Sequence, residues 1–339
     1  MPASAAPSGR GYGRGAVAVA LLLTFALLVP ALASLAGDPY LVKLATRIVI
    51  YGLAAAALDL VLGVSGLVSF GHGAFLGLGA YVAGVMFQHG FEGSTILGLE
   101  PSQSLLVLAP IAMAVSALFA ALTGMVCLRT RGVAFIMITL AFGQMLFFLF
   151  TSLERYNGDD GIALWSRNTL PGPVDPADDM AFYYLCLACL VVFLLWGRRM
   201  LDARFGRVLR AAKENERRMR ALGFAVQRYR LLAYAISGAV TGLAGLLLAN
   251  QTYFVSPALM TWQTSGHLIV MVVLGGLGTL TGPVLGAAAL LLLEDLTPPV
   301  MDLLAPGFGQ HWKLLLGPIL VAVAIYAHRG LLGSLARRG

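Results

Sequence analysis

The stretch GVSGLVSFGHGAFLGLGAYVAG, residues 63–84, contains seven glycines and also carries Ser69 and His72. Glycine weakens a helix by about 1 kcal/mol per residue relative to alanine. Yet apolar sequence long enough to cross a membrane lies on both sides of this stretch. The question it raises is why a membrane segment concentrates helix-weakening residues beside two polar side chains.

The whole chain is apolar enough to belong in a membrane. Of its 339 residues, 59% are hydrophobic and 12% are charged, whereas a soluble domain carries about 25% charged residues. The composition predicts an all-α polytopic bundle of roughly eight to ten spans, with glycine-rich broken or hairpin segments. Spans are expected near 16–36, 41–62, 71–90, 104–127, 133–152, 180–197, 231–250, 263–277, 283–297 and 312–327.

The charges predict which side of the membrane each loop occupies. Residues 198–230 hold eleven Lys and Arg against three acidic residues, a net charge of +8, which leaves −1 for the rest of the chain. Because this run lies between two spans, the positive-inside rule explains it more simply than nucleic-acid binding does. Loop 153–179 is acidic and is expected outside. A transmembrane domain at 16–329 is thus predicted between cytoplasmic tails, 1–15 and 330–339.

The first apolar run leaves two interpretations open. ALAS at 31–34 offers a signal-peptide cleavage site, and Arg10 and Arg14 supply a positive leader. The run from 16 to 36 is longer than the usual signal core, which favours an uncleaved span. Both interpretations leave residue 37 on the outer side.

A second glycine-rich segment, LGGLGTLTGPVLGAAALL at 274–291, repeats the layout of the first. Such internal similarity is typical of transporters. Two accounts are open for the glycines: close helix packing through small-xxx-small spacing, or broken backbone that lines a pathway. Intramembrane polar groups are candidate pathway residues. The predicted pathway set is Ser69, His72, Gly73, Thr139, Gln144, Gly278 and Gly282.

Several kinds of chemistry have no support in the sequence. None of Lys43, Lys213 and Lys313 stands in a phosphate-binding loop, so ATP hydrolysis by this chain is not expected. The five histidines show no metal-ligand spacing, and we expect no metal, cofactor or catalytic residue. Cys186 and Cys189 form a CxxC inside an apolar run, where buried packing is favoured over a redox pair.

Four stretches together resemble one family: GVSGLVSFGHGAFLGLGAY, RGVAFIMITLAFGQM, FGRVLRAAKENERRMRALGFAVQRYRLLAYAISGAVTGLAGLL and MVVLGGLGTLTGPVLGAAALLLLE. The chain resembles the LivM-type permeases of branched-chain amino acid ABC transporters from about Val42 to Gly333. The resemblance implies a second, LivH-type permease, two cytoplasmic ATPases that hydrolyse ATP, a periplasmic binding protein, and a bacterial inner membrane. Related permeases carry urea or short amides, which is the alternative. A secondary transporter working alone is the alternative from another class.

The basic loop carries the expected contact with the ATPases. ENERRMRALG, residues 214–223, is similar to the short docking signature of importer permeases, although it lacks consecutive Glu-Ala-Ala. Phe205, Ala212, Met219 and Val226 recur at intervals of seven, flanked by Val208 and Leu222, so one amphipathic helix over 205–223 is expected. The predicted coupling residues are Asn215, Glu216, Ala221 and Gly223, with Gly223 as the C-terminal cap.

Overall fold

The structure, a computed structural model, describes residues 39–95, 100–170 and 176–304, with residues 310, 313, 314, 317 and 318 beyond them. Helices account for nearly all of its regular structure. They are α2 (Pro39–Asp59), the π-helical turn η1 (Leu60–Val64), α3 (His72–Glu92), α4 (Leu105–Cys127), α5 (Val133–Thr151), η2 (Glu154–Tyr156), η3 (Gly158–Asp160), α6 (Asp179–Asp202), α7 (Arg204–Glu214), α8 (Glu216–Ala221), α9 (Val226–Thr252), η4 (Pro257–Met260), α10 (Trp262–Gly275) and α11 (Gly282–Leu304). Strands β1 (Ile162–Ala163) and β2 (Phe254–Val255) pair antiparallel.

The all-α polytopic prediction is confirmed. Within the described residues, seven helices are long and apolar enough to cross a membrane. They match the expected spans except 263–277, which becomes α10 with 14 residues. At 1.5 Å per residue α10 is only about 21 Å long, shorter than the roughly 30 Å hydrocarbon core. The expected span 16–36 and both tails lie outside the described residues, as does nearly all of 312–327.

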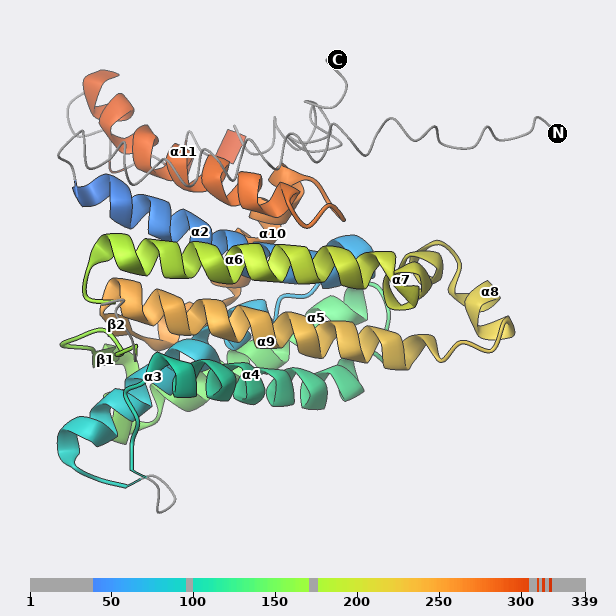
Figure 1. The fold of residues 1–339 in the computed structure, drawn as a ribbon. Coiled ribbons are helices and arrows are strands. Elements are labelled where there is room, and N and C mark those ends of the chain that lie inside the picture. The colour runs from blue at the N-terminus through green and yellow to red at the C-terminus, as the bar shows by residue number, and fades with distance from the viewer. Residues whose placement is uncertain are drawn as a thin grey trace.

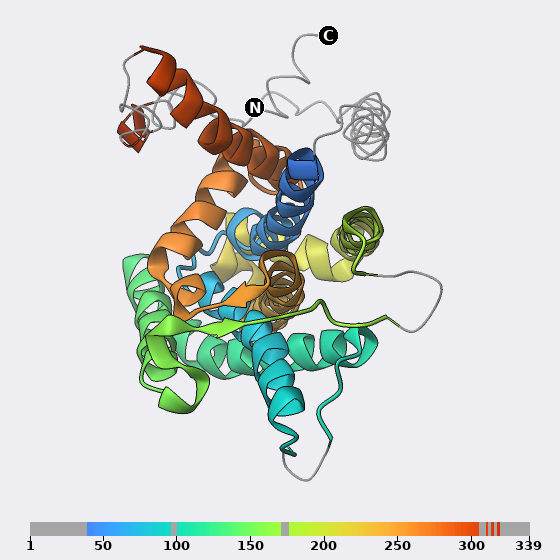
Figure 2. The ribbon, with the colours of Figure 1, turned by 90° about the vertical axis from the view of Figure 1, so that its left-hand side faces the viewer.

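Helix α9 is the centre of the bundle and packs against α2, α3 and α4. Figure 1 shows these long helices running side by side, with α7 and α8 at one end of the bundle and the β1–β2 pair at the other. The view in Figure 2, turned by 90°, shows the other helices arranged around α9. The segments expected in the cytoplasm and outside therefore lie at opposite ends.

Glycines let the central helices touch backbone to backbone. A methyl group added at Gly79 of α3 would lie 1.8 Å from the carbonyl oxygen of Gly242 in α9. One added at Gly245 would lie 1.8 Å from the carbonyl oxygen of Leu76. No side chain fits at such distances, so glycine is required there by close approach.

The predicted small-xxx-small packing is confirmed for both glycine-rich segments. A Cβ at Gly77 would lie 2.2 Å from Cγ of Met260, and a Cβ at Gly286 would lie 1.8 Å from the Met271 carbonyl oxygen. Cys186 is a buried free thiol and Cys189 a partly buried one, both packed among apolar side chains. This agrees with the packing interpretation of the CxxC pair.

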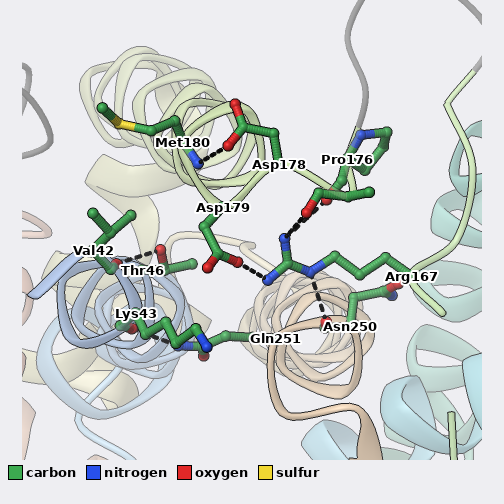
Figure 3. Close-up of polar contacts among 11 residues, drawn as sticks. Val42, Lys43, Thr46, Arg167, Pro176, Asp178, Asp179, Met180, Asn250 and Gln251 are labelled. Atoms are coloured by element: carbon green, nitrogen blue, oxygen red, sulfur yellow. Dashed lines mark hydrogen bonds and ion pairs between the residues drawn. The ribbon is translucent and has the colours of Figure 1, made fainter. Parts of the chain in front are cut away.

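Arg167 fastens the loop 153–179, which is expected outside, to the bundle (Figure 3). Its side chain is 2% exposed and forms an ion pair with Asp179 at the start of α6. Its Nε donates to the carbonyl oxygen of Asn250 in α9 at 3.2 Å, and its Nη1 donates to that of Pro176 at 2.9 Å. The guanidinium also lies 4.6 Å from the ring centroid of Phe182. A buried charge satisfied in this way holds the loop against two helices.

Candidate functional site

The first glycine-rich segment is a true break in the membrane-embedded chain. Helix α2 passes into the π-helical turn η1, and residues 65–71 then have no regular helix before α3 begins at His72. The Leu67 amide donates to the carbonyl oxygen of Val61 at 2.9 Å, and Gly66 has φ +72°. Backbone freed from a helix inside a membrane must find partners within the protein.

Side chains from α5 and α10 supply those partners. The Phe70 amide donates to Oγ1 of Thr139 at 3.2 Å. Ser265 Oγ donates to the carbonyl oxygen of Phe70 at 2.7 Å and accepts from the Gly73 amide at 2.8 Å. Hydrogen bonds from two neighbouring helices therefore fix the backbone conformation of the break.

His72 closes the break through a directed chain of hydrogen bonds. Ser237 Oγ donates to the carbonyl oxygen of Ala57 at 2.6 Å, so it accepts from His72 Nε2 at 2.8 Å. His72 Nδ1 lies 3.1 Å from Ser69 Oγ, which lies 3.3 Å from the Tyr234 hydroxyl. A fully buried imidazole with no carboxylate among these partners is neutral, so His72 carries its proton on Nε2 and accepts from Ser69 through Nδ1. It joins α2, α3 and α9 without any charge.

The structure brings together four of the predicted pathway residues: Ser69, His72, Gly73 and Thr139. The side chains of Ser69 and His72 are fully buried, and Thr139 is 1% exposed. Gln144 lies on α5 apart from this set, and its buried Nε2 atom has no hydrogen-bond partner. A pathway role for these residues stays a prediction, because in this conformation the set is closed.

The second glycine-rich segment breaks between α10 and α11. Gly276 and Gly278 have φ +118° and +78°, and Leu280 has φ +57°, a conformation that costs a non-glycine residue energy. The loop is held by Asp59 at the end of α2. The Gly278 amide donates to Asp59 Oδ1 at 2.7 Å, and the Leu280 amide donates to Oδ2 at 3.0 Å.

Gly278 and Gly282, the remaining predicted pathway residues, both belong to this second loop. Thr279 Oγ1 accepts from the Gly282 amide at 2.9 Å and donates to the Gly276 carbonyl oxygen at 2.9 Å. A Cβ at Gly282 would lie 2.4 Å from that same Thr279 oxygen. Apart from Gln144, the predicted pathway residues thus fall into two separate clusters, one at each break.

Sequence reasoning missed the partners that hold the two breaks. Ser237 stands in a mostly apolar part of its span, whereas Ser265 stands beside Gln263 and Thr264 at the polar start of its own. The sequence shows Asp59 as an acidic residue near the end of the expected span 41–62. It does not show that Asp59 anchors a loop more than two hundred residues away.

The basic loop does not form the single helix expected over 205–223. Helix α7 ends at Glu214, and α8 begins at Glu216. Asn215 between them is extended, with φ −150° and ψ +92°, and its side chain accepts from the Arg218 amide at 3.0 Å. Asparagine is a strong N-cap, which is the physical reason the helix stops and restarts there.

Only part of the expected apolar stripe is buried. Val208, Ala212, Met219 and Val226 pack together, as the spacing predicted. The prediction that Leu222 flanks this buried face is wrong, because Leu222 is 64% exposed. Past it the chain turns at Gly223 with φ +85°, and the Phe224 amide donates to the carbonyl oxygen of Met219 at 3.1 Å, so Gly223 is the predicted cap.

Glu216 is bound to arginines of its own chain. It forms ion pairs with Arg230 of α9 and Arg131 of the α4–α5 turn, each at 3.0 Å, and with Arg220 one turn along α8. Partial burial raises the pKa of Glu216, but attraction to Arg230, then Arg131 and Arg220, outweighs it and holds this pKa below the ordinary 4.5. Ala221, the fourth predicted coupling residue, is exposed at the end of α8.

The comparisons agree with this architecture. Residues 40–324 match the family described as branched-chain amino acid transport system, permease component. The chain belongs to this family. It is 32% identical over 315 residues to the LivM permease protein of the high-affinity branched-chain amino acid transport system of Salmonella typhimurium, covering 86% of this chain and 69% of that protein.

Two further LivM proteins extend the likeness. The Escherichia coli K12 protein is 31% identical to this permease over the same shares of both chains. The probable LivM of Methanocaldococcus jannaschii is 28% identical over 158 residues, 44% of this chain and 46% of that protein. No solved structure matches. The permease is thus a multi-pass membrane component of a transport system, as the resemblance implied.

Proposed function

We propose that this permease is the LivM-type subunit of an ABC importer for branched-chain amino acids in a bacterial inner membrane. It pairs with a LivH-type permease subunit. Two cytoplasmic ABC ATPases drive the cycle, and a periplasmic binding protein delivers the solute. The family match over residues 40–324 supports the assignment, and so does a 30% identity over 152 residues to a probable LivH permease.

The single observation that carries the coupling part of this proposal is the α7–α8 element. It projects from one end of the bundle (Figure 1) and presents Leu222, 64% exposed, and Phe224, 39% exposed. A shallow cleft of about 300 Å³, lined by residues that include Arg220, Phe224 and Arg228, lies beside them. An exposed apolar tip rimmed by cations suits a groove on a partner ATPase. A carrier that works alone needs no such element.

Asn215, Glu216 and Gly223 shape this tip and Ala221 borders it. Asn215 and Gly223 cap the two ends of α8, and Glu216 ties α8 to α9 and to the α4–α5 turn. We therefore assign the contact itself to Leu222 and Phe224. The four predicted residues act by fixing the shape and place of α8.

The two breaks form the moving part of the pathway in this proposal. Proteins tolerate unwound backbone inside a membrane where it is buried or lines a cavity, and alternating access exposes it in turn. Few fixed charges lie near either break, which suits a small, largely apolar zwitterion such as leucine, isoleucine or valine. Urea or a short amide is the alternative solute. The permease itself binds no cofactor and catalyses no reaction, and its N- and C-termini are cytoplasmic.

Reconstitution tests the proposal. The permease alone in vesicles is expected to hydrolyse no ATP and to accumulate no leucine. With its LivH-type partner, the ATPases and the binding protein, it is expected to take up leucine against a gradient when ATP is present. Concentrative uptake by the permease alone would overturn the ABC assignment. Preference of the binding protein for urea over leucine would overturn the solute assignment only.

Docking through the tip has its own test. Leu222→Arg is expected to abolish co-purification of the ATPases and to leave the bundle folded, because Leu222 is exposed. Arg217→Glu, on the short helix α8 just before Leu222, is the matched control and is expected to retain the ATPases. Equal co-purification of wild type and Leu222→Arg would rule out this surface.

A further inference from the structure

One side chain of the cytoplasmic element reaches the membrane-embedded breaks. Lys213 lies in the last turn of α7, and its Nζ donates to the carbonyl oxygen of Gly63 at 2.7 Å. Gly63 belongs to η1, the turn that follows α2 directly. The stem of Lys213 lies along the next glycine, since a Cβ at Gly66 would be 3.0 Å from Lys213 Cγ. Lys213 therefore touches the chain on both sides of Ser65, where the first break begins.

Gly63 is also pressed against the second break. A Cβ on Gly63 would lie 2.0 Å from Asp59 Oδ1 and 2.2 Å from the Gly278 nitrogen. No side chain separates these three groups. A shift of η1 by even a fraction of an ångström must therefore move the Asp59 carboxylate or the loop that it holds.

Asp59 connects Gly63 to the loop at 276–281 through hydrogen bonds. Its side chain is fully buried, and its two oxygens accept from the amides of Gly278 and Leu280. The Lys213 ammonium acts on this carboxylate electrostatically across Gly63. A buried carboxylate depends strongly on its donors and on the nearest cation, so the arrangement has one favoured geometry.

We propose that Lys213 is the positioning residue that passes the movement of α7 to both glycine-rich breaks. The route runs from Lys213 Nζ to the Gly63 carbonyl, and from Asp59, in contact with Gly63, to the loop at 276–281. The proposal rests on the proposed function, because it supposes that partner ATPases move α7. It assigns to Asp59 the role of transmitting a displacement, and no proton transfer.

Lys213→Met is the test variant, because methionine keeps an unbranched apolar stem along Gly66 and removes the donor. Lys43→Met, the same exchange at an exposed lysine near the start of α2, is the matched control. In the full reconstituted complex, Lys213→Met is expected to retain the ATPases and basal ATP hydrolysis. Leucine uptake per ATP is expected to fall about tenfold to a hundredfold, the range for loss of a hydrogen bond from a charged group. Lys213→Arg, which keeps a cationic donor, is expected to restore most of the uptake.

A second readout follows the loop directly. Leu277, 50% exposed between Gly276 and Gly278, is replaced by cysteine as a site for a maleimide. In the otherwise wild-type complex, the labelling rate of Leu277→Cys is expected to change when ATP is added. In the complex that also carries Lys213→Met, adding ATP is expected to leave the labelling rate unchanged. A residue with only a structural role would not remove the nucleotide response while leaving the complex assembled.

The outcomes separate the two levels of the proposal. If the wild-type complex shows no ATP-driven uptake, the proposed function fails. If it transports and Lys213→Met transports equally well, or Leu277→Cys keeps its nucleotide response in that variant, the relay is overturned. Loss of ATPase co-purification in Lys213→Met would also overturn it, since Lys213 would then be a docking contact.

Discussion

The two glycine-rich breaks share a sequence layout, but different chemistry closes them. The first is held by neutral side chains that form a fully buried hydrogen-bonded chain through His72 and Ser237. The second is held by one carboxylate, Asp59, and its neighbour Leu277 is half exposed. Neutral networks are rigid and insensitive to distant charge, whereas a buried charge responds to any change in its partners. The difference indicates a rigid unit that turns as a pivot at the first break, and a responsive loop at the second.

The largest expected effect is at the carboxylate. Asp59→Leu has similar volume but leaves the amides of Gly278 and Leu280 unpaired and removes the charge that holds the second loop. We expect a loss of about 3–5 kcal/mol of stability, the usual cost of breaking a buried charged group's interactions. Thermal unfolding of the purified complex in detergent measures it. A variant as stable as wild type would show that the second loop does not depend on charge.

The counterpart at the first break is His72→Phe. Phenylalanine fills the space of the ring but removes the partners of Ser69 and Ser237, so we expect a smaller loss, about 1–3 kcal/mol. The same unfolding experiment compares it with Asp59→Leu. If His72→Phe is the more damaging change, the assignment of pivot and responsive loop must be reversed.

The tightness of the two breaks can be compared with one methyl group at each. A Cβ at Gly282 meets an oxygen at 2.4 Å, whereas at Gly73 the nearest atom is the Thr261 carbonyl oxygen at 2.8 Å. Overpacking costs about 1–3 kcal/mol, and we expect Gly282→Ala to lie higher in that range than Gly73→Ala. Leucine at either position is expected to block transport. Normal assembly and uptake with both leucine variants would remove the physical reason for these glycines.

The smallest expected effect is at Glu216, which anchors α8. Because its pKa is held below the ordinary 4.5, its ion pairs contribute stability above that value and lose it as the pH falls through the lowered value. Hydrogen exchange at 216–221, corrected for the intrinsic rate, is expected to speed up below about pH 4.5 in wild type. Glu216→Gln is expected to show weaker protection at neutral pH with no such acid transition. An unchanged transition in Glu216→Gln would assign it to another group.

Glu216→Arg separates shape from docking. It places a cation among Arg131, Arg220 and Arg230, so α8 is expected to detach from α9 and coupling to be lost while the bundle stays folded. Co-purification of the ATPases and substrate-stimulated hydrolysis measure the loss, and Arg217→Glu serves as the control. Full coupling in Glu216→Arg would show that the position of α8 does not matter.

The sequence by itself determined seven of the expected spans, the two glycine-rich breaks and the opposite ends of the bundle at which the basic and acidic loops lie. These features follow from the local sequence. Runs of apolar residues, clusters of glycine and the sign of loop charges can be recognised without knowing the tertiary contacts. The cap at Gly223 and the seven-residue spacing of Ala212, Met219 and Val226 were likewise readable from short windows.

The tertiary structure alone decided what closes each break. Gly73 meets a serine 192 positions away, and Gly278 meets a carboxylate 219 positions away. The pairing of Glu216 with Arg131 and Arg230 also depends on how helices pack. Hydropathy fixes that a segment enters the membrane, but freed backbone groups can be satisfied by any suitable donor or acceptor that packing brings near. Helix packing therefore determines that Ser265 and Asp59 are those partners.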